Sequence, residues 1–500
     1  MKNRTRIHGT HVLVEEPSTA SIPDSCIAAN SILTVHCWGI RQRVGEYGVA
    51  KDLLNKSFSR ITVLNVGPDR RKACNDGQLV GDGPVANTKH HQILVVGGGT
   101  AGVTVAASLR RRGPTSLNIA IVEPSETHYY QPCFTLVGAG AYDMAKTQRP
   151  ERSLIPAGVT LIHGAAKAFD PDKNSVVLET GDALTYDYLV VCTGVKLDWD
   201  KIEGLSATLG KNSVCSNYSP LYAPYTWQCV QELKPGSRAV FTQPPLPFKC
   251  PGAPQKIVYL TADRLRRAGA LQACDLQYFV HAPVVFGVPF FARELMKVVT
   301  RYGIKTHFQQ NLVAVDGAAK TATFEAVGGD DKGKRTTVTF DMLHVSPPQS
   351  PHDAIKKSPL ANAAGWVEVN QNSMQHVRYP NVFSLGDVCS TPNSKTAAAV
   401  RKQSPIVVSN LLRMIAGTPV EAGYDGYASC PLTTAYGKTI LAEFIYGGKV
   451  TPTLPLDPAK ERWIGWWIKV TGLPIFYWNY MLKGYEWFFK HDTAFKGDAA

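Results

Sequence analysis

Three glycines follow a short apolar segment at a spacing suited to holding a phosphate group. Ile93 to Val96 form an apolar, β-prone run, Gly97-x-Gly99-x-x-Gly102 follows it, and an alanine-rich helical segment comes next. In such a loop the first glycine turns the chain, the second lets a pyrophosphate approach the backbone, and the third lets helix and strand pack closely. The free N–H groups and the dipole of the helix N-terminus attract the negative charge. The sequence therefore predicts a dinucleotide-binding strand, loop and helix.

An acidic residue stands at the position where such a unit contacts the ribose. A second strand is expected over residues 118–122 and ends in Glu123, about 20 residues after the glycines, as this fingerprint requires. The alternative is a glycine-rich turn in an unrelated α/β protein. The loop alone leaves open whether the nucleotide is FAD or NAD.

A cysteine occupies a second loop between a strand and a helix. Cys250 lies between an expected strand, residues 238–241, and a helical stretch, residues 255–267. Prolines fill this loop and remove N–H donors, so a second pyrophosphate site is not expected there. Cys250 stands at the mouth of the helix beside Lys249 and Lys256, where a thiol pKa is lowered and the thiolate becomes reactive. The alternative is an incidental loop cysteine.

Two further strand ends favour FAD for the first loop. Thr193 and Gly194 end an apolar strand, and Gly386 and Asp387 end another; similar endings occur in flavin-dependent enzymes. A helix expected from Thr396 would direct its N-terminus toward the flavin ring, where it stabilises negative charge.

A second cysteine, Cys389, lies between the Gly-Asp pair and this expected helix. Cys250 and Cys389 each occupy a loop expected to face the flavin, which is what a redox disulfide built from distant parts of a sequence needs. Cys192, on an apolar strand, is interpreted as a small core residue. His344, also within an apolar strand, is interpreted as structural and is left out of the catalytic set. Residues 159–162 and 175–178 are expected to form strands of a β-meander.

Composition excludes several classes of protein. The 500 residues carry a net charge of +13, but Lys and Arg are spread along the chain, so we do not expect nucleic acid binding. The eleven cysteines include no C-x-x-C pair, which argues against a zinc site or a secreted disulfide framework, and no metal is expected. No run of about 18 apolar residues predicts a membrane-spanning helix.

The two ends of the chain differ from its middle. Residues 1–89 are basic and contain serines, as in a mitochondrial transit segment, although their acidic residues leave a disordered tail or an artefactual extension open. The tail after about Leu454 holds five of the nine tryptophans with interspersed lysines and is expected to form two short amphipathic helices. Such segments lie in the membrane interface, where a lipophilic acceptor could enter. The alternative is an aromatic docking or dimer helix.

Between about Lys89 and Lys490 the chain resembles the sulfide:quinone oxidoreductases of the mitochondrial type. The resemblance is carried by GGGTAG, IVEPSETHYYQP with LVGAGA, KCPGAPQKIVYL, HVSPPQSP, YPNVFSLGD with SKTAAAV, and YDGYASCPLTTAYGKTILAEF. It implies a peripheral flavoprotein of the mitochondrial inner membrane that oxidises hydrogen sulfide and sends two electrons through FAD to ubiquinone. It also implies that hydrosulfide attacks a bridge between Cys250 and Cys389, and that the sulfane sulfur passes to glutathione or sulfite.

The position of the second cysteine departs from this pattern. Many relatives place it directly after Gly-Asp, where this chain has Val388, so Cys389 comes one residue later. Cys133 is the reserve candidate. Cys430 is interpreted as structural, although its motif is part of the resemblance.

The sequence as a whole predicts an α/β fold with two Rossmann-like βαβ domains and a C-terminal amphipathic helical segment for membrane attachment. The expected divisions are a leader (1–89), the FAD-binding domain in two parts (90–205 and 346–430), a second Rossmann-like domain (206–345) and a quinone and membrane-interface segment (431–500). A type II NADH:quinone oxidoreductase and a catalytically inactive FAD-binding homologue remain the alternatives. The residues expected to bind FAD are Gly97, Gly99, Thr100, Ala101, Gly102, Glu123, Gln131, Ala166, Thr193, Gly194, Asp353, Gly386, Asp387 and Lys395.

Overall fold

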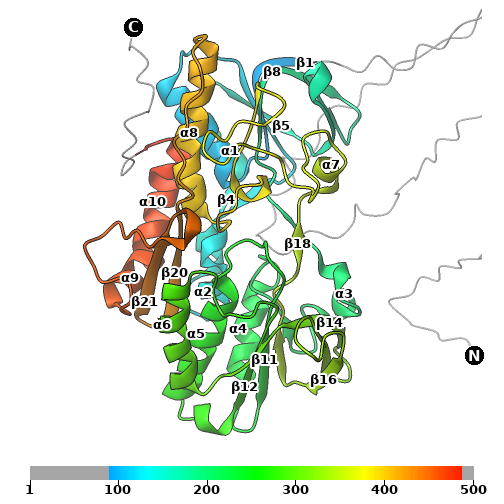
Figure 1. Ribbon diagram of the computed structural model, residues 1–500, viewed down its shortest axis with the longest axis vertical. Coiled ribbons are helices and arrows are strands. Elements are labelled where there is room, and N and C mark those ends of the chain that lie inside the picture. Colours follow the sequence, from blue (N-terminus) through cyan, green and yellow to red (C-terminus); the bar gives the residue numbers. More distant parts are fainter. Residues whose placement is uncertain (1–88, 487–500) are drawn as a thin grey trace, which may run out of the picture. The chain divides into compact units, whose positions relative to one another are not determined.

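The computed structural model of the protein describes residues 89–486 (Figure 1). The expected leader, apart from its last residue, and the end of the expected membrane segment lie outside the described residues. Within them, the strands form two main sheets that are flanked by helices, and a short helical segment follows toward the C-terminus. The predicted α/β fold is confirmed.

The larger sheet of the described chain contains the glycine-loop strand at its centre. Its order is β5-β2-β1-β8-β7-β6, with β19 also paired to β8, and β1 runs parallel to both neighbours. Because helices cover a parallel sheet on its faces, its strands read as continuous apolar runs, and Ile93 to Val96 are buried accordingly. Helix α1 (Thr100–Arg112) packs against α8 (Ala397–Ile415). The strands are β1 (Lys89–Val96), β2 (Ile119–Glu123), β5 (Val159–His163), β6 (Ala166–Asp170), β7 (Ser175–Leu178), β8 (Ala183–Val191) and β19 (Val382–Ser384).

One strand of the expected meander has a different partner. Strand β5 pairs in parallel with β2 at the edge of the larger sheet, whereas β6, β7 and β8 form the antiparallel meander. The prediction of a strand over 159–162 was right, but its place in a meander was wrong. A short strand of mixed burial can belong to a meander or to the edge of a parallel sheet. The free edge of β2 decides the partner of β5.

The second sheet has the order β10-β17-β11-β12-β13, and all its pairings are parallel. Its strands are β10 (Val214–Cys215), β11 (Arg238–Gln243), β12 (Asp275–Val280), β13 (Lys305–Phe308) and β17 (Met342–His344), and an antiparallel sheet of β14 (Gln310–Asp316), β15 (Thr321–Ala326) and β16 (Arg335–Thr339) adjoins it. The helices of this part are α3 (Leu205–Thr208), α4 (Ala223–Glu232), α5 (Ala253–Arg267) and α6 (Pro289–Tyr302). The remaining short elements are β3 (Thr127–Tyr129), α2 (Phe134–Gly138), β4 (Gln148–Pro150), β9 (Lys196–Leu197), β18 (Gln349–Ser350) and α7 (Asp353–Lys356).

A late hairpin packs on a helix from the middle of the chain. Strands β20 (Ala428–Ala435) and β21 (Lys438–Phe444) pair in antiparallel fashion, and β20 lies against α5 (Figure 1). The hairpin is followed by α9 (Trp463–Trp467), a π-helical turn over Ile468–Gly472, and α10 (Leu473–Asn479). None of the helices in residues 89–486 is long and apolar enough to cross a membrane.

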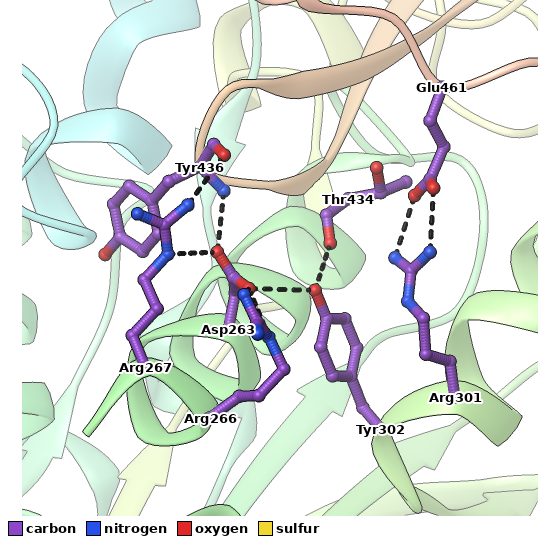
Figure 2. A network of polar contacts seen from close by, with 8 residues as sticks. All are labelled: Asp263, Arg266, Arg267, Arg301, Tyr302, Thr434, Tyr436 and Glu461. Carbon is purple, nitrogen blue, oxygen red and sulfur yellow. Dashed lines mark hydrogen bonds and ion pairs between the residues drawn. The ribbon is translucent and has the colours of Figure 1, made fainter. Parts of the chain in front are cut away.

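A buried carboxylate fastens the tip of this hairpin to α5 and α6 (Figure 2). Asp263, on α5, is fully buried and accepts hydrogen bonds from Arg266, Arg267, the Tyr302 hydroxyl and the backbone N–H of Tyr436 at the hairpin turn. Burial alone would raise the pKa of Asp263, but the hydrogen bonds from Arg266, Tyr436 and Arg267 outweigh it and hold the pKa below its usual value. The turn of the hairpin is thereby fixed against the C-terminal end of α5.

Replacing this carboxylate should loosen the hairpin. We expect Asp263→Ala to lower the free energy of unfolding by about 2–3 kcal/mol, because it leaves a buried hydroxyl and N–H group and two half-exposed arginines without their acceptor. Since the folded-state pKa of Asp263 is depressed, its contribution is present above the unfolded pKa and is lost as the pH falls through the folded value. Urea unfolding at neutral and acidic pH measures both effects. The exposed Asp331→Ala should change stability by at most about 0.5 kcal/mol, and an equal effect of the two substitutions would contradict the prediction.

Candidate functional site

The glycine loop adopts the geometry that its spacing predicts. Gly97 has a φ of +109°, and a Cβ at Gly102 would overlap with the carbonyl oxygen of Gly97, so both positions require glycine. A Cβ at Gly99 would meet nothing within 4 Å, so this side of the loop is open. Gly98 donates its N–H to Glu123 Oε2 at 2.7 Å. The loop is thus held by the next strand while its open side faces a cavity.

The cavity in front of this loop has a volume of about 770 Å³, within the usual range for ligand sites. It lies where α1 begins, and segments from the whole described chain contribute to its wall. Of the residues expected to bind FAD, those lining it are Gly97, Gly99, Thr100, Ala101, Glu123, Gln131, Thr193, Gly194, Gly386, Asp387 and Lys395.

Three residues expected to bind FAD lie away from the cavity wall. Gly102 is buried inside α1, where it serves the close packing of the helix on the loop. Ala166 lies on β6 and pairs with Leu178. Asp353 begins the short helix α7 and binds the side chains of Lys196 and Lys356. The structure therefore does not bring Ala166 or Asp353 to the site.

The cavity wall contains buried polar atoms that a cofactor could satisfy. Thr193 Oγ1 and Glu151 Oε1 are buried and have no hydrogen-bond partner, and both residues line the cavity. Buried oxygens without partners are rare in native proteins and call for one. Burial also raises the pKa values of Glu123 and Asp387, which come from distant parts of the sequence but line the same cavity. The carboxylates and Thr193 fit the hydroxyls of a dinucleotide, and the open side of the glycine loop at the start of α1 fits its pyrophosphate.

Cys250 lies in the cavity wall in a strained conformation. Its φ of +51° is uncommon for a residue other than glycine, and its backbone N–H donates to the carbonyl of Lys395 at 2.8 Å. Its own carbonyl accepts from Ala253, the first residue of α5. Strained residues of this kind concentrate at functional sites, where the surrounding structure enforces them.

The sulfur atom next to Cys250 belongs to Cys430. The two Sγ atoms lie 3.9 Å apart, and both cysteines line the cavity. At this distance the sulfurs are in contact but not bonded, and a modest movement would bring them to the bond length of about 2.05 Å. Cys430 lies on β20, so the packing of β20 on α5 brings together two cysteines that are 180 residues apart.

Cys389 occupies a different position from the one expected. It is fully buried, is not part of the cavity wall, and its Sγ interacts with the carbonyl of Gly386 and the hydroxyl of Thr391, both at 3.1 Å. No contact between the sulfurs of Cys389 and Cys250 is found among residues 89–486. The expected neighbour of Cys250 was wrong, because the loop after Asp387 directs the Cys389 thiol inward toward its own backbone. Cys430, which the sequence analysis interpreted as structural, lines the cavity and contacts Cys250.

Two buried lysines surround the sulfur pair. Lys256, in the first turns of α5, places Nζ 3.4 Å from Cys250 Sγ and is 2% exposed. Lys469, from the π-helical turn near the C-terminus, is equally buried, lines the cavity, and donates to the carbonyl of Pro132 at 2.6 Å. The cavity therefore receives positive charge from two distant segments.

The surroundings shift the pKa values of the two thiols in opposite directions. The contact from Cys430 and, after it, the positive charge of Lys256 lower the pKa of Cys250 well below its usual value, although burial opposes them. The same contact, together with burial, raises the pKa of Cys430. Burial raises the pKa of Cys133, the reserve candidate, to about 11, and Cys133 does not line the cavity. Cys250 is thus the more acidic of the two thiols.

Two other residues take the places that the sequence predicted. Cys192 is buried in the core and contacts the Gly97 carbonyl at 3.3 Å. His344 is fully buried, its Nε2 accepts from the N–H of Asn217, and burial lowers its pKa to about 3. Cys192 also contributes to the cavity wall, whereas His344 does not line it.

The sequence analysis missed a polar chain that joins the C-terminal segment to the glycine loop. Tyr477 Oη on α10 lies 2.7 Å from Thr100 Oγ1 and 2.6 Å from His128 Nε2. His128 Nδ1 lies 3.0 Å from Glu151 Oε2. Tyr477, His128 and Glu151 are buried, and all four residues line the cavity. Their signal was weak, because a tyrosine in an aromatic tail and a histidine 349 residues before it carry no common motif.

The narrow contact between Gly252 and Cys430 provides a test of the sulfur geometry. A Cβ at Gly252 would overlap with Cys430 Sγ and the Leu432 side chain. Because such overlap costs about 1–3 kcal/mol, we expect Gly252→Ala to reduce disulfide formation between Cys250 and Cys430 about tenfold. Mass spectrometry after titration with a thiol and disulfide buffer measures the fraction of protein that carries this disulfide. At Gly287 a Cβ has open space, so Gly287→Ala should behave as the parent; a normal disulfide in Gly252→Ala would contradict the geometry.

The charge of Lys256 should be visible in the reactivity of Cys250. In the reduced protein, iodoacetamide should modify Cys250 before Cys430, with a half-maximal rate at a pH below that of an ordinary thiol. Lys256→Met should shift this pH upward by about one unit, because the thiolate loses a cation. The exposed Lys297→Met is the control. A shift of equal size in the control, or no shift in Lys256→Met, would show that Lys256 does not set this pKa.

Comparison with known proteins agrees with this geometry. The profile of the pyridine nucleotide-disulphide oxidoreductase family matches residues 91–222. The chain is 44% identical over 401 residues to the mitochondrial sulfide:quinone oxidoreductase of Dictyostelium discoideum, which covers 80% of this chain and 87% of that protein. It is 40% identical over 396 residues to the mouse (Mus musculus) protein of that name, and the match covers 79% of this chain and 87% of the mouse protein.

Among solved structures, the sulfide:quinone oxidoreductase of Aquifex aeolicus has a similar fold, with a TM-score of 0.66 at 21% identity over 80% of this chain and 92% of that one. A glycine loop, a cavity and a contacting cysteine pair thus occur in a chain whose relatives match it over most of their length. The chain belongs to the family of mitochondrial sulfide:quinone oxidoreductases.

Proposed function

We propose that the protein oxidises hydrogen sulfide at Cys250 and Cys430 and passes two electrons through FAD to ubiquinone. The observation that carries the proposal is the contact of the two sulfurs, 3.9 Å apart, in the wall of the cavity that the glycine loop opens into. The names of the relatives support sulfide and quinone as substrates. The role assigned from sequence to Cys389 passes to Cys430.

The chemistry begins from the oxidised pair. Hydrosulfide attacks the Cys430 sulfur, the bond between Cys250 and Cys430 breaks, and a new sulfur–sulfur bond leaves a persulfide on Cys430. Cys250 departs as a thiolate, which the ammonium group of Lys256 stabilises at 3.4 Å. A nucleophilic acceptor, glutathione or sulfite, then removes the outer sulfur and leaves a thiolate on Cys430. The sulfide sulfur has lost two electrons, which remain on the reduced cysteine pair.

FAD, when bound, would take these two electrons as the bond between Cys250 and Cys430 forms again, and would deliver them to the quinone. The residues that would hold it are those at the open side of the glycine loop and the carboxylates of Glu123 and Asp387. Thr193 Oγ1 and Glu151 Oε1 would find in it their missing partners. Lys249, whose Nζ donates to Gln131 Oε1 at 2.8 Å, would fix the polar wall between the loop and Cys250.

The C-terminal segment is suited to a membrane surface. Its inner side lines the cavity with Ile468, Leu473 and Phe476, whereas Trp463 and Ile475 are 71% and 51% exposed. Large apolar side chains exposed on short amphipathic helices bind at the membrane interface. We propose that this segment lies on the mitochondrial inner membrane without crossing it, and that ubiquinone enters the cavity along its apolar side. The net charge of +13 would favour an anionic membrane and the approach of hydrosulfide.

The alternative of an NADH:quinone oxidoreductase is not supported. Strand β11 ends at Gln243 and is followed by prolines instead of a glycine-rich loop, so no second pyrophosphate site adjoins it. The family relationship favours sulfide as the electron donor. Bleaching of the flavin by sulfide, with none by NADH, would separate the two activities and would also exclude an inactive homologue.

Single cysteine substitutions test the assignment of the pair. We expect Cys250→Ser and Cys430→Ser each to lower sulfide-dependent quinone reduction by about a thousandfold or more, because each removes one half of the redox disulfide. Cys389→Ser should keep most of the activity, and Cys274→Ser, at a half-buried thiol outside the cavity, is the control. Quinone reduction and the flavin absorbance of the purified variants are the measurements. Full activity in Cys430→Ser, or loss of activity in Cys389→Ser with FAD retained, would return the second role to Cys389.

A further inference from the structure

A carboxylate in the apolar part of the cavity wall has no role in the sulfur chemistry. Glu443, on β21, lines the cavity and is 8% exposed. Its Oε1 accepts hydrogen bonds from the hydroxyls of Tyr427 and Thr453, and its Oε2 accepts from the N–H of Thr453 at 2.9 Å. Leu441, two residues before Glu443 on β21, pairs with Pro431 on β20, and both line the same cavity, as do Leu454, Ile468 and Leu473.

Tyr427 extends this polar group along the cavity wall. It also lines the cavity, and its hydroxyl accepts from Arg401 at 3.1 Å while it donates to Glu443. Burial raises the pKa of Tyr427 to about 12, so the hydroxyl keeps its proton at neutral pH. The arrangement places a protonated hydroxyl in the cavity with a carboxylate directly behind it.

Glu443 also reaches a second, smaller hollow. That hollow, of about 20 Å³, shares Leu441, Glu443 and Leu454 with the large cavity. Its other lining residues are Thr439, Pro452, Leu456, Asp457, Pro458, Lys460 and Arg462, and the side chains of Asp457 and Lys460 are 43% and 68% exposed. Glu443 therefore lines both the large cavity and a small hollow that includes solvent-exposed charged side chains. This is the position of a group that transfers protons across a wall.

We propose that Glu443 and Tyr427 deliver the protons that quinone reduction consumes. The inference rests on the proposed function, in which ubiquinone receives two electrons from sulfide. Each carbonyl oxygen of the quinone must then gain one proton, so that two O–H bonds form. The Tyr427 hydroxyl gives its proton to a quinone oxygen. The Glu443 carboxylate takes up a proton from water in the hollow and passes it to the Tyr427 oxygen, so that both groups return to their starting states. Two passages through this relay complete the quinol.

Several charged groups face the relay and set its electrostatics. Arg401 and Lys402 on α8 lie over the Tyr427 ring, and Asp425 accepts the N–H of Tyr427. Asp457, Lys460 and Arg462 line the hollow. The nearby cations stabilise the carboxylate that remains on Glu443 after it has given up its proton.

The test separates proton delivery from electron transfer. We expect Glu443→Gln and Tyr427→Phe to slow reoxidation of the sulfide-reduced enzyme by a short-chain ubiquinone analogue by about a hundredfold. Reduction of the flavin by sulfide should stay within about twofold, as should reoxidation by ferricyanide, because ferricyanide takes electrons without protons. Glu325→Gln, at a half-buried carboxylate paired with Arg335 on the antiparallel sheet, is the matched control and should leave all three rates unchanged. Stopped-flow absorbance of the holoenzyme measures each rate.

Other outcomes would overturn the inference. Unchanged reoxidation by quinone in both variants, equal slowing with ferricyanide, or a higher KM for quinone at unchanged kcat would each remove the proton role from Glu443 and Tyr427. Failure of sulfide to bleach the flavin in the parent enzyme would instead refute the proposed function, so the two failures are distinguishable.

Discussion

The site depends on the packing of strand β20 against helix α5. The helix supplies Lys256 and follows directly after Cys250, and the strand supplies Cys430. Neither segment alone brings two sulfur atoms into contact. The hydrogen bonds of Asp263 hold the far ends of the two elements together, so the separation of the sulfurs is set over the whole length of the contact and not by the cysteine loops alone.

The glycine loop and its acidic partner could be predicted from the sequence, because strand, turn and helix follow one another without interruption and every residue in them has a local reason. Gly97 needs a positive φ, Gly102 needs close packing, and Glu123 ends the next strand. The location of Cys250 at the mouth of a helix could also be predicted, because its loop contains several prolines and two neighbouring lysines. These predictions use information within about 30 residues of chain.

The partner of Cys250 could not be predicted in this way. Cys389 follows a Gly-Asp motif that leads to the cofactor site, but the direction of its side chain depends on one residue of register and on the carbonyl of Gly386 that accepts its thiol. Cys430 lies on a strand whose sequence is that of an ordinary buried hairpin, and only the docking of that hairpin on α5 brings its sulfur into the cavity. The same holds for β5, whose strand was evident and whose partner was not. Long-range packing, and not local preference, decided each of these cases.

The contact between Tyr477 and Thr100 has a consequence for the biogenesis of the enzyme. Residues 377 positions apart complete one wall of the cavity, and the earlier of them stands in the glycine loop itself. When all strands of the larger sheet have been synthesised, the glycine loop still lacks the residues of α10 that complete the cavity wall. The complete cavity wall therefore exists only once nearly all of the described chain has been synthesised and folded, so a cofactor held there is enclosed at a late stage of maturation.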